Sequence, residues 1–131
     1  GSGSPTSLLI GDVALLHDVN GLLSLNRRAV DLSIVVTNND GGSIFSFLPQ
    51  AEHLDQATFE LLYGTPHGVS FEHVAKTYGL TYFRATNEEA LRAALAQPGT
   101  KIVEVVLDRA VNVDQHDELN SSIAAAVTTT A

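Results

Sequence analysis

Hydrophobic residues in this chain occur in short continuous runs. In the longer stretches between these runs, hydrophobic residues recur at helical spacing. The runs cover residues 7–10, 31–37, 81–85 and 101–107. They are too short for helices and have Gly, Pro, Asn or Asp at or near their ends. Three are rich in Val, Ile and Leu, and the run 81–85 is partly aromatic. Apolar runs of this kind are typical of strands buried on both faces of a parallel sheet. The pattern therefore predicts four buried strands.

Helices are predicted between and after these strands. Ser70 can cap a helix that Gly79 ends, and Thr86 with Glu89 has the spacing of a capping box for a helix that runs through Gln97. Residues 43–48 stay ambiguous, with a helical turn before Pro49 as one interpretation. The other predicted helices cover residues 13–28, 54–63 and 115–127.

The alternation of strands and helices predicts the fold class. It is α/β, a doubly wound parallel sheet flanked by helices on both faces. The first strand is short and no Met occurs anywhere, so we expect a domain truncated at its N-terminal side. We divide the chain into a leader (residues 1–6), one domain (7–127) and a tail (128–131).

Composition excludes several classes of function. The 131 residues carry a net charge of −8, so no basic face is available for nucleic acid. There is no Cys, which excludes disulfides and thiolate metal sites. No apolar run approaches the ~20 residues of a membrane helix. No signal peptide is visible, and we expect a cytoplasmic protein.

Two of the predicted strand ends have side chains that suit a metal ion and a diphosphate. Gly11 allows a sharp turn into a helix start, whose backbone N–H groups form an anion site, and Asp12 adds a carboxylate. Asn39 offers a side-chain carbonyl oxygen and Gly41 a backbone carbonyl oxygen. Such oxygen ligands suit Mg²⁺, with Mn²⁺ or Ca²⁺ as possible substitutes. The alternative interpretation is a pair of ordinary turns.

Three longer strings carry a resemblance to a known family: GDVALLHD, NNDGGSIF and YGTPHGVSFEHVA. Together they resemble the C-terminal diphosphate-binding (PP) domain of thiamine-diphosphate enzymes. Within that family they are most similar to the 2-succinyl-5-enolpyruvyl-6-hydroxy-3-cyclohexene-1-carboxylate (SEPHCHC) synthases of menaquinone biosynthesis. The third glycine of the Gly-Asp-Gly signature is replaced here by Val13, and Ala14 stands where that branch has a serine hydroxyl.

The resemblance implies a role for each matched residue. Asp12 and Asn39 would bind Mg²⁺ through their side chains, and Gly41 would bind it through its backbone carbonyl. Phe45 and Leu48 would lie near the substrate. The expected cofactor-binding residues are Gly11, Asp12, Val13, Asn39, Gly41, Gly42, Ile44 and Phe45. No catalytic residue is expected in this chain, because the family's catalytic glutamate belongs to a separate pyrimidine-binding domain.

The resemblance also implies an activity for the parent protein. That activity is a transferase reaction in which 2-oxoglutarate is decarboxylated and its succinyl unit is added to isochorismate. The cofactor would lie between this domain and the pyrimidine-binding domain of another subunit, so the parent would be a homo-oligomer and this chain alone inactive.

Two alternatives stay open. One is a non-catalytic doubly wound module, receiver-like or flavodoxin-like, that binds an anion or a partner. The other is the PP domain of a different thiamine-diphosphate enzyme, such as acetolactate synthase. His67 either approaches the site through its loop or belongs to a plain turn, whereas His53 and His116 are expected at the surface.

Overall fold

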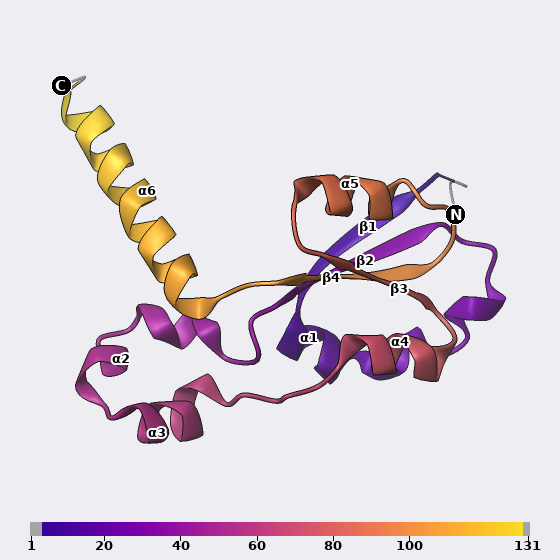
Figure 1. Cartoon of the computed structure of the whole chain (residues 1–131), viewed down its shortest axis with the longest axis horizontal. Coiled ribbons are helices and arrows are strands. Elements are labelled where there is room, and N and C mark those ends of the chain that lie inside the picture. Colours follow the sequence, from indigo (N-terminus) through magenta and orange to yellow (C-terminus); the bar gives the residue numbers. More distant parts are fainter. Residues whose placement is uncertain (1–3, 130–131) are drawn as a thin grey trace.

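The structure is a computed structural model, and it describes residues 4–129. Figure 1 shows a small sheet with helices on both sides and a helical extension beyond one end of the strands. The strands are β1 (Thr6–Gly11), β2 (Leu32–Asn38), β3 (Thr81–Ala85) and β4 (Lys101–Val106). The α-helices are α1 (Asp12–His17), α2 (Gln50–His53), α3 (Gln56–Phe59), α4 (Phe71–Tyr78), α5 (Glu88–Leu95) and α6 (Arg109–Thr129). The shorter 3₁₀ and π turns are η1 (Val19–Leu22), η2 (Leu25–Arg27), η3 (Ser43–Phe47) and η4 (Glu60–Gly64).

The four strands form one parallel sheet in the order β1-β2-β4-β3, which confirms the predicted fold class. The connections from β1 to β2 and from β2 to β3 cross the sheet in one direction, and the connection from β3 to β4 returns. Right-handed crossovers require the returning helix to lie on the opposite face. The helices obey this rule, since α1 and α4 cover one face and α5 covers the other.

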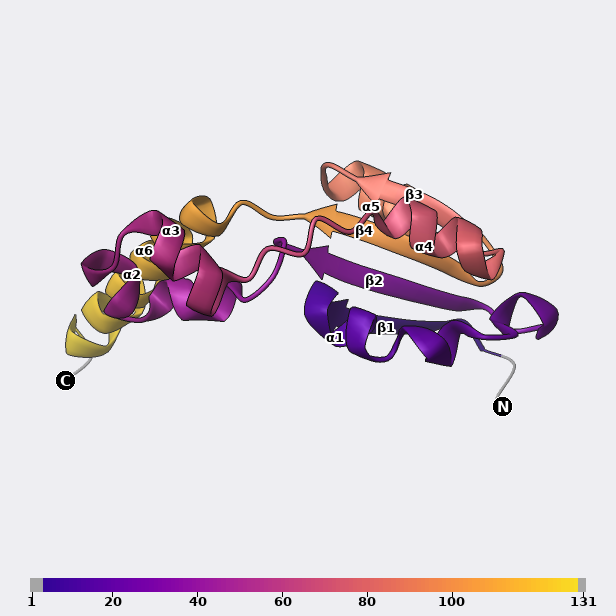
Figure 2. The ribbon, with the colours of Figure 1, turned by 90° about the horizontal axis from the view of Figure 1, so that it is seen from below.

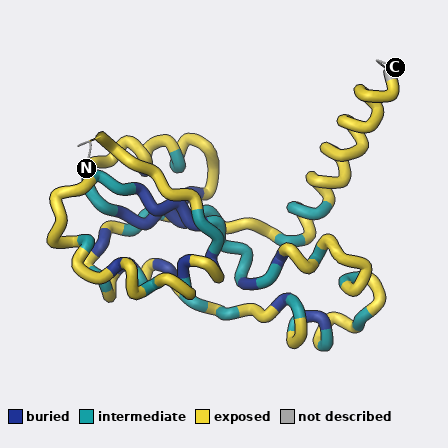
Figure 3. The backbone as a smooth tube through the Cα atoms, turned by 180° about the vertical axis from the view of Figure 1, so that it is seen from behind, coloured by how far each residue is buried: buried dark blue, intermediate teal, exposed yellow. Residues whose placement is uncertain are grey.

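Both faces of the central strands are buried, which explains the unbroken apolar runs of β2 and β4. On the α1 and α4 face, Leu15 and Phe71 pack against Ile34 of β2 and Ile102 of β4. The core under α5 is smaller and consists of Val35, Ala85, Ala94 and Val103. Figure 3 shows the buried residues concentrated in the sheet and the helices beside it, whereas the described part of α6 is mainly exposed.

The residues that cap α4 are the predicted ones, whereas the residue that caps the N-terminus of α5 differs from the prediction. The Ser70 hydroxyl accepts a hydrogen bond from the His73 N–H, and Gly79 ends α4 in the left-handed conformation. For α5 the prediction of Thr86 as the capping residue is wrong. Asn87 caps the helix instead, because its side-chain oxygen accepts from the Ala90 N–H at 2.8 Å.

The predicted helix over residues 13–28 is wrong beyond its first turns. α1 ends at His17, and two 3₁₀ turns, η1 and η2, replace the remainder. Ser24 adopts the left-handed conformation with φ of 65° between these turns. This conformation interrupts helical hydrogen bonding, and the helical spacing of the leucines did not reveal it.

Two further helix boundaries differ from the prediction. The predicted helix over residues 54–63 is divided into α3 and η4, and it begins after Asp55, whose side chain caps α3. The last helix begins at Arg109, ahead of the predicted range 115–127. Residues 43–48, which the sequence leaves ambiguous, contain the 3₁₀ turn η3.

The extension of the molecule lies beyond the carboxyl ends of the strands. In Figure 2 the arrowheads of β2 and β4 point toward η3, α2 and α3. α6 packs against η3, where the rings of Phe47 and His116 meet edge to face at 5.1 Å. This edge of the sheet is also where parallel α/β folds bind ligands.

Candidate functional site

The site is built around Asp12, the residue that follows β1. Its side chain is buried, with 3% of the residue exposed. Oδ1 accepts a hydrogen bond from the Val13 N–H at 2.7 Å, and Oδ2 accepts from the Asn39 and Gly41 N–H groups at 3.1 and 3.0 Å. Asp12 therefore ties the end of β1 to the loop that follows β2.

The same donors set the ionisation of Asp12. Burial alone raises the pKa of a carboxyl group, because it disfavours the charged form. Here hydrogen bonds from the Gly41 and Val13 N–H groups, from the His67 ring and from the Asn39 N–H outweigh burial and hold the pKa of Asp12 below its usual value. Asp12 is thus kept as a carboxylate, the form that binds a metal ion.

The loop after β2 has an unusual backbone. Asp40 and Gly41 both have positive φ, 60° and 121°. A Cβ atom on Gly41 would lie 2.6 Å from the Thr65 carbonyl oxygen and closer still to that of Gly64. Gly42 is equally confined, since its Cβ would meet the Tyr63 carbonyl oxygen. Glycine at 41 and 42 lets this loop pass directly over the turn that ends η4.

Asn39 has the one side-chain nitrogen or oxygen atom in the described residues that is buried without a hydrogen-bond partner. Its Nδ2 donates to the Ser43 hydroxyl at 2.6 Å, which fixes the orientation of the amide. Its Oδ1 accepts nothing, although buried polar atoms in folded proteins are almost always paired. An amide oxygen in this state suits a cation as its missing partner.

His67 connects Asp12 with Asp40. Its Nδ1 accepts from the Val69 N–H at 2.9 Å, so the ring proton lies on Nε2, which faces Asp12 Oδ2 at 3.2 Å. The backbone N–H groups of His67 and Gly68 both donate to Asp40 Oδ1, at 3.1 and 2.7 Å. Of the two interpretations that the sequence allows for His67, the structure supports its approach to the site.

Arg109, at the start of α6, was missed by sequence analysis. Its Nε donates to the Asn39 carbonyl at 2.7 Å, and its Nη2 donates to the Asp40 carbonyl. Nη1 pairs with Glu60 Oε2 at 2.9 Å, which links α6 to η4. The loop is thus held from the side opposite Asp12, and the only signal for this contact was an arginine shortly after a buried strand.

The remaining predicted residues lie beside this loop and are open to solvent. Nothing lies within 4 Å of the position that a Cβ on Gly11 would occupy. Val13 is half exposed at the start of α1. Ile44 is 72% exposed on η3, and Phe45 and Leu48 are also exposed, although Phe45 meets Tyr63 edge to face at 5.7 Å. The structure therefore brings together the residues that the sequence selected, and an exposed apolar strip adjoins them.

Comparison with known proteins identifies the family. Residues 2–108 match the family model described as "Thiamine pyrophosphate enzyme, C-terminal TPP binding domain". The chain belongs to this family. Thiamine pyrophosphate is thiamine diphosphate, so the match supports this cofactor and favours the family resemblance over the receiver-like alternative. The loop around Asp12 and Asn39 is part of the matched TPP binding domain.

Three similar proteins carry the name 2-succinyl-5-enolpyruvyl-6-hydroxy-3-cyclohexene-1-carboxylate synthase. The protein from Myxococcus xanthus is 45% identical over 96% of this chain and 22% of its own length. Those from Rubrobacter xylanophilus and Thermobifida fusca are each 48% identical, over 91% and 95% of this chain and 21% and 22% of their own lengths. The chain thus spans about a fifth of the length of these relatives.

Residues 4–129 lack two further features. Within residues 4–129, no three His, Cys, Asp or Glu side chains gather closely enough to hold a metal ion by themselves. A metal here would therefore use amide and backbone oxygens beside Asp12. No helix in the same residues is long and apolar enough to cross a membrane.

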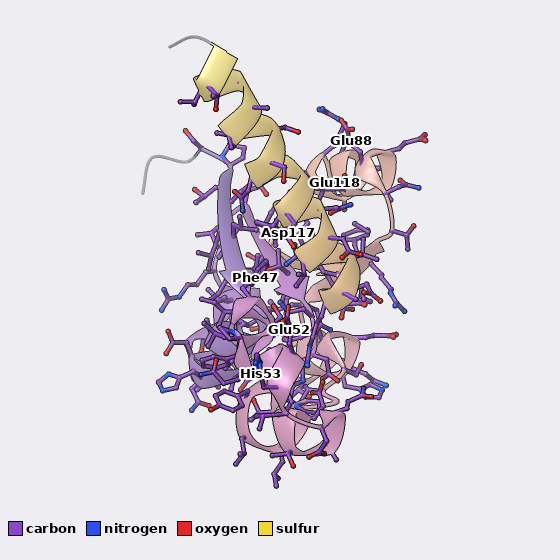
Figure 4. All side chains as sticks on the ribbon, turned by 90° about the vertical axis from the view of Figure 1, so that its left-hand side faces the viewer. Phe47, Glu52, His53, Glu88, Asp117 and Glu118 are labelled. Carbon is purple, nitrogen blue, oxygen red and sulfur yellow. The ribbon has the colours of Figure 1, made fainter. Side chains whose placement is uncertain are left out.

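Surface residues complete the comparison with the sequence. His53 and His116 are exposed, as predicted. Figure 4 shows Asp117 and Glu118 along α6 and Glu52 beside His53 on α2, at the outer side of the extension. Because α6 begins at Arg109, Asp117 and Glu118 lie within this helix and not at its start.

Proposed function

We propose that this chain is the cofactor-binding part of a Mg²⁺-dependent SEPHCHC synthase. The observation that carries the proposal is the orphaned, buried Oδ1 of Asn39, which lies in the loop hydrogen-bonded to the Asp12 carboxylate. The relatives' shared name supports the reaction, and the TPP binding family supports the cofactor.

The proposed metal ligands are Asp12, Asn39 and Gly41. Asp12 supplies the charge and its pKa is already lowered, so binding would displace no proton near neutral pH. Asn39 supplies the free amide oxygen, and Gly41 supplies a backbone carbonyl, which also accepts the Ser43 N–H at 3.0 Å. Two or three protein oxygens with phosphate and water form the coordination that Mg²⁺ prefers, and Mn²⁺ or Ca²⁺ could substitute.

The proposed diphosphate position lies between the end of β1 and this loop. The open space at Gly11 admits a group that a side chain would exclude. Val13 and Gly42 would border the diphosphate through their backbones. Ile44 and Phe45 would pack against the remainder of the cofactor, and Phe45 and Leu48 would reach the substrate.

In this proposal the residues of the chain bind and orient, and the bound cofactor supplies the carbanion chemistry of decarboxylation and carbon–carbon bond formation. Asp12 and Asn39 hold the metal and thereby the diphosphate. The apolar side chains of η3 keep water from the reacting end. The acceptor would be isochorismate and the donor 2-oxoglutarate, and the parent enzyme would act in menaquinone biosynthesis in the cytoplasm.

The proposal requires a second domain over the site. Ile44 of η3 and Leu61 of η4 are 72% and 76% exposed, Leu62 of η4 is also exposed, and the two turns are in contact. Clustered apolar side chains of this kind favour an interface. The partner would be the pyrimidine-binding domain of another subunit, which supplies the catalytic glutamate, so the parent would be a homo-oligomer. The isolated chain would bind cofactor and catalyse nothing.

The test is a calorimetric titration of the chain with thiamine diphosphate, with and without MgCl₂. Asp12→Ala and Asn39→Ala should abolish the metal-dependent binding, whereas Asp18→Ala, which removes an exposed carboxylate from the end of α1, should leave it unchanged. Binding that does not need a divalent cation, or that survives in both site variants, would exclude the proposed site. SEPHCHC formation by the isolated chain would contradict its inactivity.

A further inference from the structure

A charged residue interrupts the apolar run of β4. Glu104 is 7% exposed and lies beside Val36 of β2 in the middle of the sheet. A carboxylate in this position is costly unless donors surround it. Both of its oxygens have one: Asn38 Nδ2 donates to Oε1 at 2.5 Å, and the Tyr82 hydroxyl of β3 donates to Oε2. Glu104 thus joins the neighbouring strands β2 and β3.

The direction of these hydrogen bonds is fixed. Burial raises the pKa of Tyr82 above its usual value, and the hydrogen bond to Glu104 raises it further, so the hydroxyl keeps its proton and donates. Glu104 as a carboxylate can only accept. The Asn38 amide must therefore turn its NH₂ group toward Glu104 and its Oδ1 away.

Oδ1 of Asn38 points into the loop described above. It accepts from the Asp40 N–H at 3.0 Å. Asp40 lies between Asn39 and Gly41 and has a φ of 60°, which a non-glycine residue adopts only at a cost. If the Asn38 amide rotated by 180°, its NH₂ would face the Asp40 N–H and its oxygen would face the carboxylate. Glu104 makes that orientation unfavourable.

We propose that Glu104 is a positioning residue for the metal- and diphosphate-binding loop and acts through the amide of Asn38. This inference rests on the proposed function of that loop. Asn38 is the link, since its NH₂ donates to Glu104 and its oxygen holds Asp40, the residue between two proposed metal ligands. Partners of this kind, one step removed from the ligands, set metal affinity by orienting them.

The variants separate positioning from stability. Glu104→Met keeps the size of the side chain and removes both acceptors, and replacing a buried charge by an apolar group is often neutral or stabilising for the fold. Glu104→Gln keeps an oxygen for Asn38 and turns an NH₂ toward the Tyr82 hydroxyl, which can also accept. Tyr78→Phe is the control for the Glu104 variants. It removes a hydroxyl beside the core cluster that Tyr82 also packs against, and it leaves the donors to Glu104 in place.

Three readouts are made on the whole 131-residue chain. They are the urea midpoint, the hydrogen exchange of the Asp40 amide by NMR without ligand, and calorimetric titration with thiamine diphosphate and MgCl₂. We expect Glu104→Met to speed Asp40 exchange and to weaken binding on the order of 10–100-fold, with the urea midpoint unchanged or raised. Glu104→Gln and Tyr78→Phe should resemble the parent chain.

A double variant tests the route. In an Asn38→Ala background, Glu104→Met should cause no further change in Asp40 exchange or in binding, because the link is already absent. Additive effects would overturn the inference, and so would unchanged Asp40 exchange in Glu104→Met. A Glu104→Gln variant as impaired as Glu104→Met would show that charge, not orientation, matters. If the parent chain binds no cofactor, the proposed function fails, and the exchange measurement still decides the role of Glu104.

Discussion

Gly41→Ala is the substitution for which the structure defines the largest effect. Gly41 combines a φ of 121° with carbonyl oxygens of Gly64 and Thr65 inside the space that a Cβ would need. Both obstacles are backbone atoms, so no side chain can rotate away. The loop and the turn after η4 would have to separate, and the Gly42 N–H to Gly64 carbonyl hydrogen bond of 2.8 Å would be lost with them.

The magnitude follows from two separable costs. Backbone strain in a sparsely populated region is worth about 1–3 kcal/mol. Forcing an extra methyl into a closely packed position costs about 1–3 kcal/mol more. Gly41→Ala should therefore lower the free energy of unfolding by roughly 2–6 kcal/mol, out of the ~5–15 kcal/mol typical of a domain.

Matched glycines isolate each cost. Gly99 has a φ of 90° but nothing within 4 Å of its Cβ position, so Gly99→Ala measures strain alone. Gly42 lacks a positive φ but meets the Tyr63 carbonyl, so Gly42→Ala measures the clash alone. Gly21 has neither obstacle and serves as the blank.

The assay is urea unfolding of the four variants, with the free energy taken from the midpoint and the slope. We expect Gly41→Ala to be the least stable and to lose cofactor binding, with Gly21→Ala near the parent chain. If Gly41→Ala were no less stable than Gly99→Ala, the close approach of this loop to residues 64 and 65 would be refuted.

Three other predictions follow from single contacts. Since the folded-state pKa of Asp12 is depressed, the contribution of Asp12 to stability is present above pH ~4 and is lost as pH falls through the folded pKa. The difference in urea midpoint between the parent chain and Asp12→Asn should therefore become smaller below about pH 4. Arg109→Lys should cost about 1–3 kcal/mol because an ammonium cannot reproduce the fork that binds three carbonyls and a carboxylate, whereas Arg92→Lys at an exposed pair should cost less than about 0.5 kcal/mol. Asn87→Ala should cost about 1 kcal/mol in thermal or urea unfolding and Thr86→Ala almost nothing, and the reverse order would restore Thr86 as the cap.

The strands were predictable because their signal is local. Residues 31–37 and 101–107 are apolar since β2 and β4 are buried on both faces, and polar or glycine residues mark their ends. The helix predicted over 13–28 failed for the opposite reason. Leucines at helical spacing also occur in consecutive 3₁₀ turns, and the left-handed Ser24 that separates those turns depends on its surroundings.

The residues of the candidate site also fall into a predictable group and an unpredictable one. Asp12, Asn39 and Gly41 were visible because each follows a strand, and parallel strand ends meet at one edge. Arg109 was not visible, since its partners at Asn39 and Glu60 lie far away along the chain. Its position shortly after β4 gave no indication of which loop it would hold.

Glu104 was partly predictable from the sequence. A carboxylate inside a run as apolar as KIVEVVL is a signal that the sequence contains, because a charge is buried in a sheet only with partners. The sequence does not reveal that those partners are Asn38 and Tyr82. The loop after β2 owes its positive φ at Asp40 to contacts from β4, α6 and the turn at His67, which hold it from three directions. A strained loop of this kind persists because several elements fix it together, so loss of any one contact should loosen the loop before it unfolds the sheet.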